Sequence, residues 1–392
     1  MLVLAFFLQK EVQLEHEWKI IMNDFLAQKG YRMYGFSTAY MPPFYSYYLL
    51  ICKNIFGFTN WIKVSCIIQA VIYYYSMFYL FKTFLKNSLY QWRIVIFFLS
   101  VVFFPPIFVG NVSVSSFSLS VSILSVFFTL LFKIFSEEKY QKRHLYAIAL
   151  ASIAGLYIRY EFLYIIVLSS LIFIFLKKIN VISFIKILFF IFLVYLPWMM
   201  RNYIEIGKLS YATSLNYNFA KGYNEAHDVF SSYNFPYNPE TKQKLPINVL
   251  YKQFENEKQI DEHLSALNRE FILKHPVLFL KLTLQKLLIN ILQYFPNYDS
   301  LSSHKIYVFY SLFFAVFQAF LIWAMAKLKS AKRIYLLTFT VSFYMFFIFF
   351  YSISPMPRYF LLFYPVFFVV IIKSFEDKNG GYTKLWQKKI VS

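Results

Sequence analysis

The sequence predicts an all-α polytopic membrane protein. Of its 392 residues, 59% are hydrophobic, 23% are aromatic and only 15% are charged, which is too apolar for an ordinary soluble domain. Apolar stretches long enough to cross about 30 Å of hydrocarbon recur along the chain, and we expect about 9–10 transmembrane helices. The predicted spans lie near 61–81, 94–110, 116–135, 145–158, 162–176, 182–199, 307–326, 334–352 and 358–374.

The chain opens with the apolar stretch 1–8, which is too short to cross a membrane alone. We interpret it as a thin first span or as the end of one that begins upstream, because the charge and cleavage site of a signal peptide are missing. Residues 14–28 then predict an amphipathic helix at the membrane interface, ending at Gly30. Its apolar stripe consists of Leu14, Trp18, Ile21 and Phe25.

A second interfacial helix is predicted to begin at Pro42-Pro43, because proline favours the first turn of a helix. Its apolar positions recur at helical spacing up to Gly57, where we expect it to end. The first outer loop, 10–60, therefore contains two interfacial helices ahead of the span at 61–81. The apolar positions of the second helix are Phe44, Tyr48, Ile51 and Ile55.

A large outer loop is expected over 201–305. Residues 208–248 are rich in Asn, Tyr, Pro and Gly and predict irregular coil, whereas 249–293 predict helix broken at Pro276. We treat 1–374 as one membrane domain and 375–392 as a cytoplasmic tail. The apolar face of the helical part comprises Leu264, Leu267, Phe271, Leu278, Leu282 and Leu287.

The net charge of +20 follows membrane topology rather than a nucleic-acid surface. Lysines and arginines gather in alternate connections, as the positive-inside rule requires of cytoplasmic segments. The remaining polar segments are therefore expected to share the outer face: residues 10–60 and 201–305, Arg159 and Arg358. The cytoplasmic cations are Lys82, Lys86, Arg93, Lys133, Lys139, Lys142, Arg143, Lys177, Lys178, Lys327, Lys329, Lys332, Arg333 and those of the tail.

Carboxylates near the first membrane segment are the leading candidates for chemistry. Glu15, Glu17 and Asp24 belong to the first interfacial helix. A partly desolvated carboxylate at an interface has a raised pKa and can act as a general base. The alternative is an ordinary solvated helix face.

Arginines at the outer ends of spans are candidates for binding phosphate, since guanidinium binds such oxygens bidentately. They occur in the turn Arg159-Tyr160-Glu161, after a span at Arg201, and before the last span at Arg358. A structural pair between Arg159 and Glu161, or snorkelling by Arg201, would explain them without function.

Metal and nucleotide sites have little support in the sequence. His263 with Asp261 and Glu262, and His227 with Asp228, lack ligand spacing and are expected to be solvated loop residues. Walker and GxGxxG motifs are missing, and a divalent cation at the Glu17 cluster stays open. The two cysteines, Cys52 and Cys66, are expected to be buried free thiols.

Four sequence blocks follow one another in an order that resembles a known family. The first block is Glu17-Trp18, Gly30-Tyr31, TAYMPPFY at 38–45 and FG at 56–57. The others are PW at 197–198 with RNY at 201–203, Asn216 and GYNEA at 222–226; then Ala266, FI at 271–272, HP at 275–276 and Lys286; and finally RY at 358–359. Together they resemble the family 39-type, polyprenyl-phosphate-dependent glycosyltransferases of the GT-C class.

The resemblance implies a GT-C-type helical bundle with its active site on the outer face of a bacterial inner membrane. Glu17 matches the family's acid after the first span and would be the general base, with Glu15 and Asp24 as alternates. By the same comparison, the donor phosphate would be bound by Arg159, Arg201, Arg358 and Lys286. Substrates would be positioned by Glu161, Asn202, Tyr359 and Tyr45.

The activity implied is inverting transfer of a sugar from an isoprenoid-phosphate donor to the hydroxyl of a glycan, lipid or protein acceptor. Expected partners are that lipid-linked donor, the acceptor and membrane lipids, with no nucleic acid. Three alternatives remain: a flippase or transporter of lipid-linked glycan, an O-antigen ligase or polymerase, and an inactive family member. A transporter would place charged residues near mid-membrane, where the predicted spans hold almost none.

Overall fold

The computed structural model describes residues 16–84, 114–136, 142–175, 180–229 and 234–292, and single positions at 316, 319, 323, 326 and 365. This part of the chain is mostly helical, and its strands form two short hairpins. Four predicted spans lie outside the described residues, apart from single positions in the last two: those near 94–110, 334–352, 307–326 and 358–374.

Helix α2, His16–Leu26, confirms that the stretch predicted over 14–28 is helical. Trp18, Ile21 and Met22 are buried, and Phe25 is partly buried, so the predicted apolar stripe packs into the protein. The helix ends earlier than expected. Gln28 adopts a left-handed φ of 59°, and the Lys29 amide bonds back to the Asp24 carbonyl, which closes the last turn before Gly30 is reached.

Helix α3, Pro43–Phe84, begins at the expected proline and is kinked at Gly57, where φ is 73°. The segment before the kink buries Tyr45, Leu49 and Cys52, whereas most of the predicted stripe faces outward: Phe44, Ile51 and Ile55 are exposed. An outward apolar face suits a helix that lies against lipid, since the opposite face already packs on α2. The sequence pattern located the stripe but not its partner.

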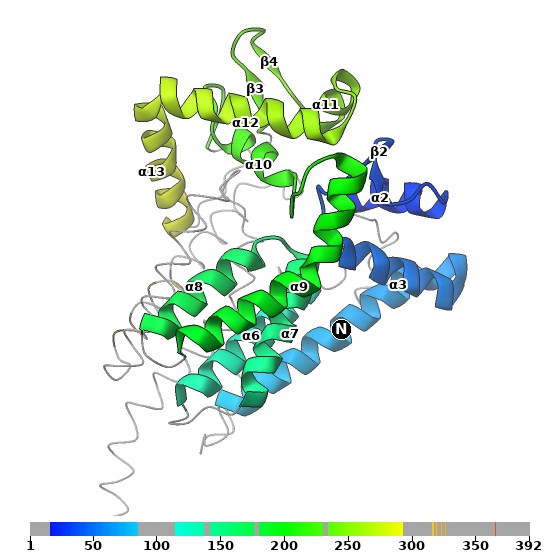
Figure 1. The fold of residues 1–392 in the computed structure, drawn as a ribbon, viewed down its shortest axis with the longest axis vertical. Coiled ribbons are helices and arrows are strands. Elements are labelled where there is room, and N and C mark those ends of the chain that lie inside the picture. The colour runs from blue at the N-terminus through cyan, green and yellow to red at the C-terminus, as the bar shows by residue number, and fades with distance from the viewer. Residues whose placement is uncertain are drawn as a thin grey trace, which may run out of the picture.

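Four further helices match the predicted spans and pack with α3 as a bundle. They are α6 (Phe117–Ser136), α7 (Lys142–Ile158), α8 (Phe162–Phe175) and α9 (Val181–Ile206). Figure 1 shows them side by side below the remaining elements. Cys52 and Cys66 are buried and free, as expected.

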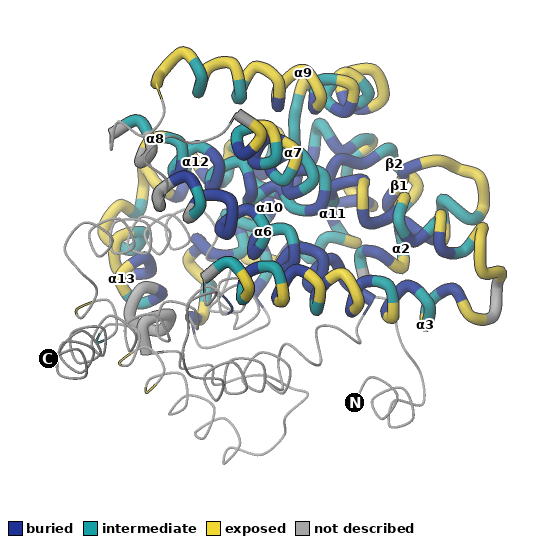
Figure 2. Tube along the Cα trace, turned by 90° about the horizontal axis from the view of Figure 1, so that it is seen from below, coloured by how far each residue is buried: buried dark blue, intermediate teal, exposed yellow. Residues whose placement is uncertain are grey.

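Two of the described helices are long and apolar enough to cross a membrane, Asn60–Thr83 within α3 and Val181–Ile206. Along α9 the buried residues Ile191, Tyr195 and Trp198 follow one helical stripe. The opposite side is exposed, as the yellow stretches of α9 in Figure 2 show, and its residues are almost all apolar. That exposed side includes Ile182, Ile185, Phe189, Phe192 and Leu193.

The large loop after α9 forms a separate layer at one end of the bundle, beside α2 (Figure 1). The prediction of irregular coil over 208–248 is wrong in part. This stretch contains α10 (Ser214–Gly222) and the hairpin of β3 (Tyr237–Asn238) with β4 (Gln243–Lys244). Helix α10 forms because Tyr217 and Ala220 bury one face against neighbouring elements, a tertiary contact that local composition does not encode.

The helical prediction for 249–293 is confirmed. Helices α11 (Ile247–Gln253), α12 (Glu257–Lys274) and α13 (Pro276–Leu292) follow in order, with the predicted break at Pro276. Leu264, Phe271 and Leu282 are buried, and Leu267 and Leu278 are partly buried. The side chain of Leu287 lies outside the described set.

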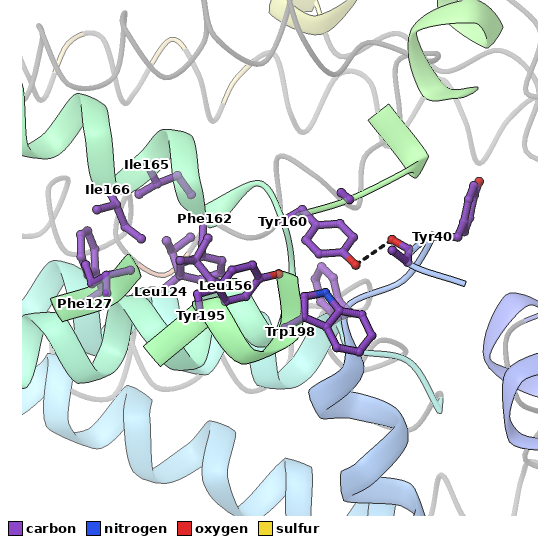
Figure 3. Close-up of a cluster of buried hydrophobic side chains, with 14 of the residues drawn as sticks. Tyr40, Leu124, Phe127, Leu156, Tyr160, Phe162, Ile165, Ile166, Tyr195 and Trp198 are labelled. Carbon is purple, nitrogen blue, oxygen red and sulfur yellow. Dashed lines mark hydrogen bonds between the residues drawn. The ribbon is translucent and has the colours of Figure 1, made fainter. Parts of the chain in front are cut away.

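One aromatic cluster joins the bundle to the first outer loop. Tyr160, in the turn between α7 and α8, donates a hydrogen bond of 2.7 Å to the Ala39 carbonyl (Figure 3). Trp198 of α9 packs edge-on against Tyr31, with ring centroids 5.4 Å apart. The two regions predicted to share the outer face, 10–60 and the start of 201–305, therefore meet at the same end of the bundle.

Candidate functional site

Helix α2 presents Glu17 in its first turn, next to the buried Trp18. Its side chain is half-buried. Burial raises the pKa of the Tyr34 phenol, and the Glu17 charge adds to that rise; the pKa of Tyr217 is raised in the same way, by burial first. Glu17 therefore lies within electrostatic reach of phenols from the β1–β2 turn (Arg32–Met33, Phe36–Ser37) and from α10.

The other two predicted carboxylates are not equivalent to Glu17. Asp24 lies two turns further along α2 and is half-buried. Glu15 lies outside the described residues, as do Arg358 and Tyr359. Glu17 is thus the candidate base whose surroundings the structure defines best.

Arg201 holds the first outer loop against α9. Its guanidinium donates to the carbonyls of Thr38 at 2.7 Å and Tyr31 at 2.9 Å, and pairs with Glu205 at 2.5 Å. It also lies over the Trp198 ring, 5.1 Å from its centroid. This arginine is more than a snorkelling side chain, because it ties two distant segments together.

Asn202 and Tyr45, expected to position substrates, make structural contacts. Asn202 is fully buried, accepts from Arg201 at 3.1 Å and donates to the Ser210 carbonyl at 2.8 Å. Tyr45 is also fully buried; it packs edge-on against Trp18 at 5.0 Å, and its hydroxyl lies 3.3 Å from the Gln69 side chain. Both support the shape of this end of the bundle.

Arg159 and Glu161 form an ion pair across the α7–α8 turn. The Glu161 Oε1 atom accepts from Arg159 Nε at 3.0 Å and Nη2 at 2.6 Å. Their side chains are 15% and 12% exposed, so neither is fully solvated. The Arg159 guanidinium therefore forms a structural pair with Glu161, the alternative to phosphate binding given for this turn.

Lys286, predicted as a weaker phosphate contact, lies elsewhere. It is fully buried on α13, where its ammonium donates to the Gly222 carbonyl and sits 3.4 Å from the centre of the Tyr223 ring. Burial holds the pKa of Lys286 well below its usual value. The structure does not bring Lys286 to Arg201.

A groove of about 1120 Å³ runs from the first outer loop down the sides of α7 and α9. One end carries Lys29, Arg32 and Arg201 together with a single carboxylate, Glu205. The part formed by α7 and α9 is mostly apolar, and aromatic rings also line the groove. The apolar and aromatic lining includes Leu150, Ile153, Ala154, Val194, Phe25, Tyr31, Tyr47 and Trp198.

Glu257 is a buried carboxylate that the sequence analysis did not single out. It is 2% exposed and accepts hydrogen bonds from the Ala39 amide at 2.8 Å, the Tyr251 hydroxyl at 2.6 Å and the Thr213 hydroxyl. Burial raises the pKa of Glu257, although these donors oppose the rise. Asn256 caps α12 just before it, a signal that marks the helix start but not the burial.

Compared with known proteins, the chain matches no family model, no curated protein and no solved structure.

Two expectations for solvated loop residues are wrong. Asp261 is 3% exposed and pairs with Lys208, while Asn216 donates to it at 2.8 Å. His227 is partly buried, and burial together with nearby Lys286 lowers its pKa to about 3. Asp261 lies on α12 and His227 follows α10, and both belong to the packed layer above the bundle. In the described part of the chain, no group of three His, Cys, Asp or Glu could hold a metal ion.

Proposed function

We propose that this protein transfers a sugar from an isoprenoid-phosphate carrier to an acceptor hydroxyl at the outer face of a membrane. The observation that carries the proposal is the groove beside Arg201, which joins a cationic end to an apolar one. A lipid phosphate has the same two parts, an anionic head and a hydrocarbon chain. Neither a soluble nucleotide sugar nor a polyanion would use the apolar half.

The cationic end suits a phosphate because Lys29, Arg32 and Arg201 outnumber Glu205. Arg201 is already fixed by two backbone carbonyls, so little of its freedom is lost when a ligand arrives. The apolar end is formed by residues of α7 and α9, the latter a helix long and apolar enough to cross a membrane. An isoprenoid chain lying there would remain in contact with lipid.

The proposed reaction has one bond formed and one broken at the anomeric carbon. The acceptor oxygen attacks that carbon, Glu17 takes the acceptor proton, and the lipid phosphate leaves with the electron pair of its glycosidic bond. Cations in the groove stabilise the charge that develops on this leaving group. The helical rise places Glu17 about 12 Å along α2 from Phe25 of the groove, so the donor sugar would lie along α2.

A transporter of lipid-linked glycan is the second candidate, because a groove open along α7 and α9 would also hold a lipid being moved. Within the enzyme hypothesis, Glu205 is an alternative general base to Glu17, because it is the carboxylate that lines the groove itself.

The test is a transfer assay with the full-length protein in nanodiscs, undecaprenyl-phosphate-linked sugars and candidate acceptors, read by mass spectrometry. We expect Glu17→Gln to lower the rate by roughly 100-fold or more, because general base catalysis contributes about that much. The matched control is Glu262→Gln, the same change at an exposed carboxylate on α12, which should leave the rate unchanged.

Glu205→Gln separates the two positions for the base. Loss of transfer in Glu205→Gln with full activity in Glu17→Gln would remove Glu17 from the mechanism. Movement of the lipid-linked sugar between leaflets with no transfer to any acceptor would favour the transporter.

A further inference from the structure

A second cavity, of about 220 Å³, lies in the outer layer and shares no lining residue with the groove beside Arg201. Its walls come from α10 and the segment after it, from the β3–β4 hairpin and from α12. We call it the loop cleft. Its volume equals that of about seven water molecules at ~30 Å³ each, enough for one sugar ring but not for a lipid chain.

Aromatic rings form the apolar wall of the loop cleft. Tyr223, Tyr237 and Phe271 all line it. Tyr223 is held firmly: its ring stacks on Phe219 at 4.6 Å, and the buried ammonium of Lys286 lies 3.4 Å from its centre. A rigid aromatic wall contributes binding energy without a large loss of side-chain entropy.

Polar groups line the rest of the cleft. Glu225 pairs with His275 at 2.7 Å and Glu270 pairs with Lys274 at 2.5 Å, while Glu240 approaches from the hairpin turn. Carboxylates accept hydrogen bonds from hydroxyl and amino groups, and these ion pairs fix two of them in place. The cleft therefore combines a flat apolar wall with several hydrogen-bond acceptors.

Asn268 provides an independent sign that the loop cleft is built for a ligand. It lines the cleft, is only 7% exposed, and its amide nitrogen donates to the Asn216 carbonyl at 3.0 Å. Its Oδ1 atom has no hydrogen-bond partner among the described residues. A buried amide oxygen without a partner is costly, and a ligand hydroxyl or amine would satisfy it after a small side-chain adjustment.

We infer that the loop cleft binds one sugar unit of the acceptor, either neutral or bearing an amino group. This inference rests on the proposed function, which supplies the reason for an acceptor. Three carboxylates face one ammonium and one imidazole, so a sugar acid or a phosphate would be repelled. A sugar ring has one apolar face for the tyrosines and hydroxyls for the carboxylates and Asn268.

The experiment measures binding of glucosamine, N-acetylglucosamine and glucuronate to the full-length protein in nanodiscs by saturation-transfer NMR. All variants carry Glu17→Gln as well, so that no substrate is turned over during the measurement. We expect the two amino sugars to bind and glucuronate to bind roughly tenfold more weakly or worse. The double variant Glu240→Gln with Glu270→Gln should weaken glucosamine binding by about fivefold or more.

The matched control changes two exposed carboxylates outside the loop cleft, Glu255→Gln with Glu262→Gln, and should alter glucosamine binding less than about twofold. Tyr237→Ala provides a second variant that tests the aromatic wall, and it should weaken both amino sugars. Equal binding of glucosamine to the Glu17→Gln protein with and without the cleft substitutions would overturn the inference. Glucuronate binding as tightly as glucosamine would overturn it too.

A last arm identifies which substrate the sugar belongs to. Saturating undecaprenyl-phosphate-linked sugar should leave glucosamine in the loop cleft; displacement would assign the cleft to the donor and overturn the acceptor assignment. Sugar binding that depends on the cleft, together with a wild-type protein that transfers no sugar to any acceptor, would contradict the proposed function and leave the binding site standing.

Discussion

At the scale of single residues, Glu257 is the contact on which three segments converge. Its carboxylate joins the first outer loop at Ala39, the start of α10 at Thr213 and helix α11 at Tyr251. Its place in the first turn of α12 adds a favourable interaction with the helix dipole. A carboxylate so fully satisfied is better suited to holding loops than to exchanging protons with a substrate.

Glu257→Ala should therefore destabilise the outer layer by about 2–4 kcal/mol, because three buried donors lose their acceptor. Glu257→Gln should cost about 1 kcal/mol or less, since its carbonyl oxygen can still accept from Ala39 and Thr213. The measurement is thermal unfolding in detergent, together with limited proteolysis of the loop. Equal losses in both variants would contradict the assigned hydrogen bonds.

The raised pKa of Glu257 also predicts a pH dependence. Between the ordinary glutamate value and the raised folded value, the folded state binds more protons than the unfolded state, so the free energy of unfolding falls as pH rises through that window. Above the folded pKa it is level again. Glu257→Gln cannot ionise and should lack this dependence; a wild-type curve parallel to that of the variant would refute the link.

The sequence could identify residue types and loops, but not which charges become buried. Glu17 and the Arg159–Glu161 pair were singled out because they stand next to apolar spans. Glu257 was not, and Asp261 was expected to be solvated, because the burial of both depends on α10 packing against α12, through contacts between residues more than 40 positions apart. Arg201 was found from its place after a span, but its bonds to Tyr31 and Thr38 belong to the tertiary structure.

At the scale of elements, the hairpin of α7 and α8 depends on a single small residue. A Cβ atom added at Gly155 would lie 2.1 Å from Cδ1 of Phe162, which is 2% exposed. The close approach lets α8 turn back directly after Ile158, and Tyr160 of this turn contacts Ala39 of the first outer loop. The apolar stretches of the sequence predicted both helices of this hairpin, whereas the close packing at Gly155 is visible only in the structure.

Gly155→Ala should destabilise the protein by about 1–3 kcal/mol, because a well-packed ring must move out of its rotamer. Phe162→Leu in the same chain should restore part of that loss, since the leucine side chain leaves room for the added methyl group. Thermal unfolding of the two single variants and the double variant forms a cycle, and the coupling energy is the readout. Simple additivity of the two losses would show that these residues do not clash.

At the scale of the whole molecule, two surfaces differ in character. The layer of α10–α12 and the β3–β4 hairpin exposes polar and charged residues, while α9 and the second part of α3 expose large apolar ones. The exposed apolar side chains include Val71, Tyr75 and Phe78 on α3 and Ile185 and Phe189 on α9. Large exposed apolar side chains along two helices are unusual on a soluble monomer and fit a hydrocarbon surround.

Phe189→Arg tests that assignment directly. Phe189 is 60% exposed near the middle of α9, so in a bilayer its replacement by arginine should cost about 2.5–3.5 kcal/mol of insertion free energy and lower the membrane-integrated fraction. Tyr203→Arg is the matched control: Tyr203 is 56% exposed on the same helix but near its outer end, where a cation reaches the headgroups at little cost. Alkaline extraction of membranes measures both. If α9 instead lay on the surface of a soluble protein, Phe189→Arg would behave like Tyr203→Arg and raise solubility, because each would simply replace an exposed apolar side chain with a charged one.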